Sequence, residues 1–190
     1  SMLVELAGYS IFNDLLDMPR YEEHFIHNQV SSELAENALF KRMIDCELVL
    51  RFFAFREKKN IRGAVKTILD RCMENNRSLA EDQLDPLRQD FRSRIDLAHE
   101  LLGLDAFKLA DPDGEKSAIS QPYYDAVIVA CDRLFDRQGD LRKKKASIKQ
   151  ALTRATGKPD AYEVIVGRAN TAEAIRLRLD YVENCFVSVL

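Results

Sequence analysis

Apolar residues recur at spacings of three and four along almost the whole chain, the pattern of α-helices that bury one face. Ser31 or Ser32 can cap a long helix that runs to about Glu57. Within it, residues 41–55 read Lys-Arg-Met-Ile-Asp-Cys-Glu-Leu-Val-Leu-Arg-Phe-Phe-Ala-Phe, with apolar side chains around most of the circumference. A helix of this kind is covered on several faces. We therefore expect residues 41–55 to be the central, buried helix of the fold.

Other helices are expected on both sides of this one. Residues 11–18 and 21–27 precede it, and one-sided apolar stripes follow at 61–73 and 84–102. Ser78 and Glu81 can form a capping box before the second stripe, which ends at Gly103. The next helix has Pro122 in its first turn and is expected to end at Gly139.

Two further helices complete the prediction: a basic helix behind Asp140 and a closing helix capped by Asn170 or Thr171. The stretch 109–117, Leu-Ala-Asp-Pro-Asp-Gly-Glu-Lys-Ser, is the clearest loop. It divides a helical core subdomain at 3–108 from a second helical subdomain at 118–190 that packs on the first. The expected fold class is all-α, an irregular multi-helix bundle around a buried central helix.

The beginning of the chain predicts that it was cut from a larger protein. Ser1-Met2 has the form of a remnant left by a cleaved tag. The helical pattern then starts without a capping residue in front of it. We expect the chain to be an excised piece of a longer protein.

Composition places the chain among globular proteins. Of its 190 residues, 46% are hydrophobic and 31% charged, which is too apolar for a disordered chain. A net charge of −3 disfavours a global attraction to nucleic acid or acidic membranes, and no apolar run approaches the roughly 18 residues that span a bilayer. The cysteines are far apart in apolar contexts, which favours reduced core thiols in a cytoplasmic protein; they are Cys46, Cys72, Cys131 and Cys185.

The central helix carries charged residues in an apolar setting. Arg42 and Asp45 are three residues apart, and Glu47 and Arg51 are four apart, so each pair is expected on one helix face. Burying such charges is costly unless they are paired. The favoured interpretation is a structural ion-pair network that fixes how neighbouring helices dock. The alternative is a ligand or phosphate site that uses Arg42 or Arg51.

The sequence offers no recognisable catalytic machinery. It contains no P-loop, no G-x-S-x-G and no H-E-x-x-H motif, and we predict no catalytic residue, cofactor or metal site on this chain. His24 and His27 could share a helix face, but no further ligand motif accompanies them. Asp111-Pro-Asp113-Gly114 begins like a calcium loop without its remaining ligands, and is interpreted as a turn.

A basic segment is the one surface feature that stands out. Residues 132–158 hold nine Lys and Arg against three Asp, a local net charge of +6 in an acidic chain. Such asymmetry is typical of a phosphate-binding face, although lysine runs also form ordinary solvated helix faces. The candidate nucleic-acid contacts are Arg142, Lys143, Lys144, Lys145 and Lys149.

Four segments resemble, in order, the helical region of one known family. They are Phe12-Asn-Asp-Leu-Leu16, residues 41–55, residues 120–131, and Val166-Gly-Arg-Ala-Asn-Thr171 followed by Arg176 and Arg178. The family is the GmrSD type, whose members typically join an N-terminal ParB/sulfiredoxin-like domain to a long helical segment, sometimes followed by an HNH nuclease domain. Its Asp-Gly-Gln-Gln-Arg motif and its HNH signature are absent here, and Val166 stands where the family usually has a small hydroxyl residue.

The resemblance implies a non-catalytic helical domain of a GmrSD-like restriction or anti-phage protein. Such a domain would couple or position neighbouring domains, with the ParB-like domain and DNA as its partners. The family's activity, nucleotide-stimulated cleavage of modified DNA in phage defence, is carried onto no residue of this chain. The alternative is a stand-alone protein-interaction or oligomerisation module, whose contact surfaces would be the apolar opening segment and the stripe at 172–186.

Overall fold

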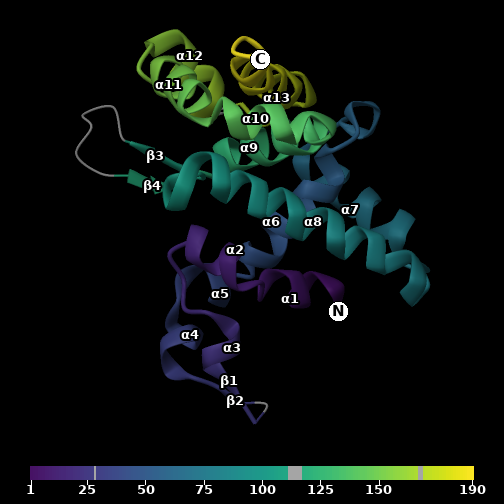
Figure 1. Ribbon diagram of the computed structural model, residues 1–190. Helices are drawn as coiled ribbons and strands as arrows, with labels where there is room; N and C mark the ends of the chain where they lie inside the picture. The colour runs from purple at the N-terminus through teal and green to yellow at the C-terminus, as the bar shows by residue number, and fades with distance from the viewer. Residues whose placement is uncertain (28, 111–116, 167–168) are drawn as a thin grey trace.

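A computed structural model describes all residues except 28, 111–116 and 167–168, and it confirms the all-α fold class (Figure 1). The chain is 76% helical, with thirteen α-helices and two short antiparallel hairpins in the described part. The first helices are α1 (Met2–Ala7), α2 (Ser10–Leu15), α3 (Tyr21–His24), α4 (Ser32–Glu36), α5 (Ala38–Lys41), α6 (Ile44–Phe55), α7 (Val65–Asn76) and α8 (Glu81–Leu102). The later helices are α9 (Gln121–Arg133), α10 (Gln138–Lys143), α11 (Lys145–Thr156), α12 (Pro159–Val166) and α13 (Ala172–Val187).

The remaining elements are short. Strands β1 (Phe25–Ile26) and β2 (Gln29–Val30) pair with each other, as do β3 (Lys108–Ala110) and β4 (Ser117–Ile119). Single 3₁₀ turns lie at η1 (Lys58–Asn60), η2 (Gly103–Asp105) and η3 (Phe135–Arg137). In Figure 1, α8 crosses the middle of the molecule, α9–α13 lie above it, and α3–α5 with the first hairpin extend below.

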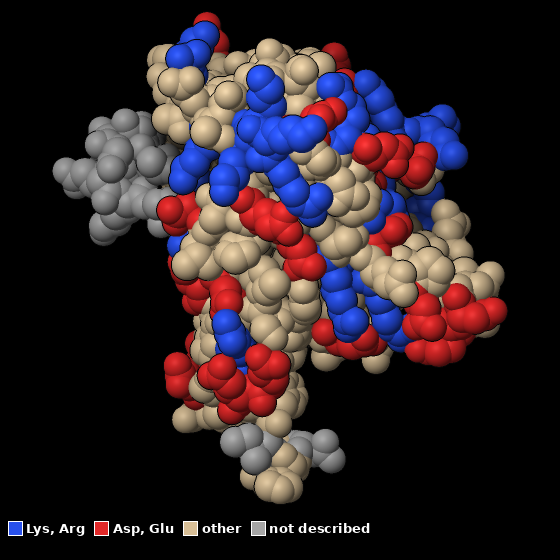
Figure 2. All heavy atoms as spheres, in the orientation of Figure 1, with Lys and Arg blue, Asp and Glu red and all other residues tan. Residues whose placement is uncertain are grey.

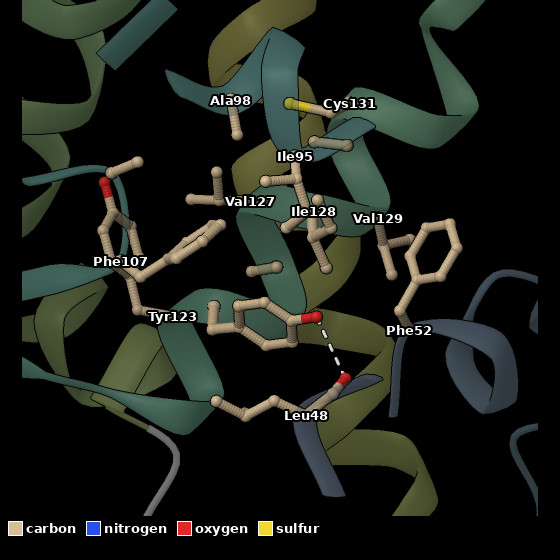
Figure 3. Close-up of a cluster of buried hydrophobic side chains, with 14 of the residues drawn as sticks. Leu48, Phe52, Ile95, Ala98, Phe107, Tyr123, Val127, Ile128, Val129 and Cys131 are labelled. Carbon is tan, nitrogen blue, oxygen red and sulfur yellow. Dashed lines mark hydrogen bonds between the residues drawn. The ribbon is translucent and has the colours of Figure 1, made fainter. Parts of the chain in front are cut away.

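One hydrophobic core runs through the whole molecule. Its buried residues extend from Leu6 to Phe186, and α9 lies at its centre, with residues 123–131 all buried. Helix α9 packs against α13 on one side and against α6 and α8 on the other. Figure 3 shows how side chains from α6, α8 and α9 interdigitate. In this region the Tyr124 hydroxyl donates a hydrogen bond to the Leu48 carbonyl oxygen at 2.9 Å. The predicted parts 3–108 and 118–190 therefore contribute to a shared core.

The predicted central helix is broken into three pieces. Asn37 ends α4 and begins α5, because its side-chain oxygen accepts hydrogen bonds from the backbone N–H groups of Leu39 and Phe40. Met43 then adopts a left-handed conformation with φ of 54°, which separates α5 from α6. The single helix expected from Ser31 or Ser32 to Glu57 was wrong for this reason. Its buried half is confirmed as α6, in which eight of twelve residues are buried.

Several other predicted boundaries move by a few residues. The helix expected at 21–27 ends at His24, where a hairpin begins. The N-cap of α8 is Ala80 and not Ser78 as predicted, and the Ala80 backbone N–H donates a hydrogen bond to the Gln83 side chain at 2.9 Å. Gly139 lies inside α10 instead of ending the helix before it.

Two predicted ends are confirmed, and the predicted loop falls partly outside the description. Gly103 ends α8 with φ of 76°, a value that favours glycine. Thr171 caps α13, because its hydroxyl accepts the Ala174 N–H at 3.2 Å. The loop predicted at 109–117 is shorter, because residues 109 and 110 belong to β3 and residue 117 belongs to β4. Residues 111–116 lie outside the described part of the chain.

Phe91 is the aromatic contact that ties the opening helices to the core. Its ring lies 5.2 Å from that of Phe12 and 5.5 Å from that of Phe52, centroid to centroid, and its side chain is fully buried. Replacing Phe91 by alanine is expected to lower the free energy of unfolding by about 3–5 kcal/mol, because it removes apolar contacts and leaves a cavity. Urea denaturation measures the change. Met73→Ala is the control, since Met73 is 53% exposed, and an equal loss in both variants would contradict the assignment of Phe91 to the core.

Candidate nucleic-acid interface

A buried ion pair joins α6 to α9. The Arg51 guanidinium contacts the Asp125 carboxylate with two hydrogen bonds, Nε to Oδ1 at 2.9 Å and Nη2 to Oδ2 at 2.5 Å. The Arg51 and Asp125 side chains are 6% and 0% exposed. Glu47 lies one turn before Arg51 on α6, and its half-exposed carboxylate forms an ion pair with Arg51, Oε1 to Nη1 at 3.2 Å. The Glu47–Arg51 pairing predicted from the sequence is thus present, and Asp125 is the partner that sequence analysis did not identify.

Arg178 is a second buried cation near the same carboxylate. It is fully buried on α13, and its Nε and Nη2 donate to the backbone carbonyls of Val164 and Ala169 at 3.3 and 3.2 Å. Burial lowers the pKa of Arg178, and the charge of Asp125 opposes that effect. Arg176 similarly donates to the Ile61 carbonyl at 2.6 Å. Both arginines of the closing motif therefore hold backbone segments in place.

The predicted pairing of Arg42 with Asp45 is not formed. Arg42 ends α5 and is exposed, whereas Asp45 lies in the first turn of α6 beyond the left-handed Met43, so the two residues do not share a helix. Asp45 instead accepts hydrogen bonds from its neighbour Cys46 N–H, at 2.8 Å, and from the Tyr21 hydroxyl. Asp45 therefore anchors α3 to the N-terminus of α6, where a carboxylate is favourably placed.

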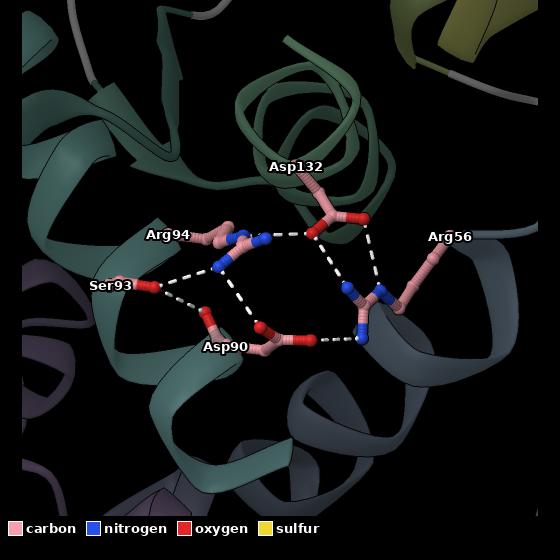
Figure 4. Close-up of polar contacts among 5 residues, drawn as sticks. All are labelled: Arg56, Asp90, Ser93, Arg94 and Asp132. Atoms are coloured by element: carbon pink, nitrogen blue, oxygen red, sulfur yellow. Dashed lines mark hydrogen bonds and ion pairs between the residues drawn. The ribbon is translucent and has the colours of Figure 1, made fainter. Parts of the chain in front are cut away.

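Four further charges close into a ring between α6, α8 and α9 (Figure 4). The Asp132 carboxylate accepts two hydrogen bonds from Arg56, both at 3.0 Å, and one from Arg94 at 2.8 Å. Asp90 contacts the same two guanidinium groups at 2.8 and 3.1 Å. Each charge thus has two neighbours of opposite sign. The Arg94 guanidinium also lies over the Phe135 ring, 3.8 Å from its centroid.

The structure separates the predicted nucleic-acid contacts into two groups. Arg142 is held by Glu100 at 2.5 Å and by Gln138 at 2.8 Å, and Lys143 contacts Asp140 at 3.4 Å. The other predicted contacts are exposed and form no ion pair with any described residue; they are Lys144, Lys145 and Lys149. In Figure 2, Lys and Arg side chains gather on the upper part of the visible face, where Figure 1 places α10.

The other candidates from the sequence do not assemble into a site. His24 contacts the Ser31 hydroxyl through Nδ1 at 2.8 Å, and Asp111 and Asp113 lie outside the described residues. Within the described residues, no group of three or more His, Cys, Asp or Glu is placed to hold a metal ion. None of the helices in the described part is long and apolar enough to cross a bilayer. All four cysteines are free thiols, with Cys46 and Cys131 buried.

The stripe on α13 is unavailable as the oligomerisation surface that the alternative hypothesis assigned to it. Ile175, Leu179, Val182 and Phe186 are fully buried. The helix that carries them packs against α9 in the same chain. These residues belong to the core.

No protein-family model, curated protein or solved structure matches the chain.

Asp125→Asn tests whether the buried carboxylate holds the core together. The substitution keeps the side-chain shape but leaves the buried Arg51 charge with only the half-exposed Glu47 as a carboxylate partner, and the free energy of unfolding is expected to fall by about 3–5 kcal/mol. Asp140→Asn, which affects only the exposed contact with Lys143, is expected to cost no more than about 1 kcal/mol. Chemical denaturation of both variants makes the comparison. Equal stability of the two would show that Arg51 finds another partner.

Proposed function

We propose that this chain is a non-catalytic helical domain of a GmrSD-like restriction or anti-phage protein in the cytoplasm. It positions neighbouring domains, among them an N-terminal ParB-like domain, and contacts DNA through α10 and the start of α11. The contact residues are Arg142, Lys143, Lys144, Lys145 and Lys149.

One observation carries the DNA contact: Lys144, Lys145 and Lys149 are exposed cations without a carboxylate partner in the described structure. Elsewhere in the molecule several arginines lie in ion pairs between or within helices, as Arg51 and Arg56 do. Exposed cations that remain unpaired can neutralise DNA phosphates and release their counterions. Lys144, Lys145 and Lys149 have this property, whereas Lys143 contacts Asp140.

The positioning role is supported by the way the charged side chains are used. The pair of Arg51 with Asp125 and the ring around Asp132 connect helices that are far apart in sequence. Such contacts fix the angles between α6, α8 and α9, so a domain attached to any of these helices would be held at a defined orientation.

A salt titration of DNA binding tests the proposal. The variant Lys144→Glu, Lys145→Glu, Lys149→Glu is expected to bind a duplex oligonucleotide at least tenfold more weakly at low salt. It should also reduce the slope of log K against log salt by up to about 2.7, since each lost phosphate contact removes about 0.9. Fluorescence anisotropy gives both quantities.

The matched control reverses three exposed cations elsewhere, in Lys59→Glu, Arg62→Glu, Lys66→Glu. This variant has the same net charge as the test variant, and it should keep the parental salt slope. Equal losses in the two variants would indicate non-specific attraction to net charge. Absence of binding by the parent chain would remove the DNA contact from the proposal.

A further inference from the structure

A second group of unpaired cations lies on a different side of α11. Along a helix of 100° per residue, Arg154 is rotated by about 180° from Lys145 and by about 140° from Lys149. The core-facing residues Ile148 and Leu152 lie between these two directions on the buried side of the helix, and the exposed residues Gln150 and Thr153 lie between them on the solvent side. The cations of α11 therefore point in two different directions, of which only one belongs to the proposed DNA contact.

The second group of cations lines a groove of about 560 Å³ between α11 and α13. Its polar lining residues come from both sides of the groove; they are Ser147, Gln150, Arg154, Lys158, Tyr181 and Ser188. No carboxylate lines this groove among the described residues, and neither cation forms an ion pair with a described residue. Asp160 lies in a neighbouring hollow of about 500 Å³, which shares Lys158 and Tyr181 with the groove.

The Lys158 charge acts across the groove. Burial raises the pKa of the Cys185 thiol on α13, and the Lys158 ammonium works in the opposite direction. The charge is therefore within electrostatic reach of the facing helix. Ser188 donates its hydroxyl to the Cys185 carbonyl at 2.9 Å, whereas Ser147, Gln150 and Tyr181 make no hydrogen bond through their side chains to a described residue. The groove thus combines two positive charges with free hydrogen-bond donors.

We propose that the groove between α11 and α13 binds a phosphate monoester, with Arg154 and Lys158 as its charged ligands. A monoester carries a charge of about −1.5 to −2 at neutral pH, close to the charge of the two cations. Arginine can bind its oxygens through two parallel hydrogen bonds, while lysine binds as a point charge. The ligand would be a free nucleotide or the 5′-phosphorylated end of a nucleic acid strand.

Titration of the whole chain with phosphate ligands, followed by heteronuclear NMR, tests this site. The probes are inorganic phosphate, AMP, and one duplex oligonucleotide prepared with and without 5′-phosphates. We expect inorganic phosphate and AMP to shift backbone amide signals of residues 147–158 and 181–188 in a saturable manner. A 5′-phosphate that strengthens duplex binding through these residues would identify a strand end as the ligand, and a preference for AMP would identify a free nucleotide; either supports the site.

Paired variants separate this groove from the DNA surface. Arg154→Gln with Lys158→Gln is expected to weaken AMP binding at least tenfold, whereas the control Lys145→Gln with Lys149→Gln should leave it within twofold. All four residues are exposed, and a melting curve checks that each variant is folded. Equal losses in the two variants, or no saturable shift with inorganic phosphate or AMP, would overturn the site. Duplex binding that depends on Lys145 and Lys149 alone, with no saturable shift from AMP, would overturn the site, yet leave the proposed DNA contact intact.

Discussion

A buried guanidinium can never shed its charge, because arginine remains protonated at any pH at which the protein is folded. Arg51 therefore requires a negative partner inside the core, and Asp125 supplies it with two hydrogen bonds. The planar geometry of this contact leaves little freedom in the distance or rotation between α6 and α9. Burial raises the pKa of the Asp125 carboxylate, and the positive charge of Arg178 on α13 also acts on it, in the lowering direction. Three helices of the core are therefore arranged around one negative charge.

A group of four other charges also joins helices, nearer to the surface of the molecule. The ring of Arg56, Asp90, Arg94 and Asp132 fastens the edge of the α6–α8–α9 junction, with its members 9–31% exposed. Because the charges alternate in sign, each member of the ring is stabilised by both of its neighbours. The cations on the two sides of α11 form no ion pair with a described residue, so they are free to contact a ligand.

The sequence predicted the fold class, because periodic apolar positions require only local geometry. It also predicted that Arg51 would be paired, since a buried charge requires a partner. It could not identify Asp125 as that partner, because residue spacing shows only which side chains share a helix face, and Asp125 is 74 residues away. The break at Met43 was also missed: a left-handed methionine has no sequence signature, although Asn37 was a visible cap. The sequence showed the basic segment as a run of charge. That its cations point in two different directions became visible only from the helix α11.

The separation between Arg51 and Asp125 has a consequence for the order of folding during synthesis. Ribosomes add about 5–20 residues per second, so the 74 residues between the partners take about 4 to 15 s to make. Throughout that interval α6 lacks α9 and Arg51 lacks Asp125, although two other partners of α6, α1 and α7, are made before α9. The contact between α6 and α9 can therefore form only after residue 125 is made, and until then the Arg51 charge has to remain hydrated.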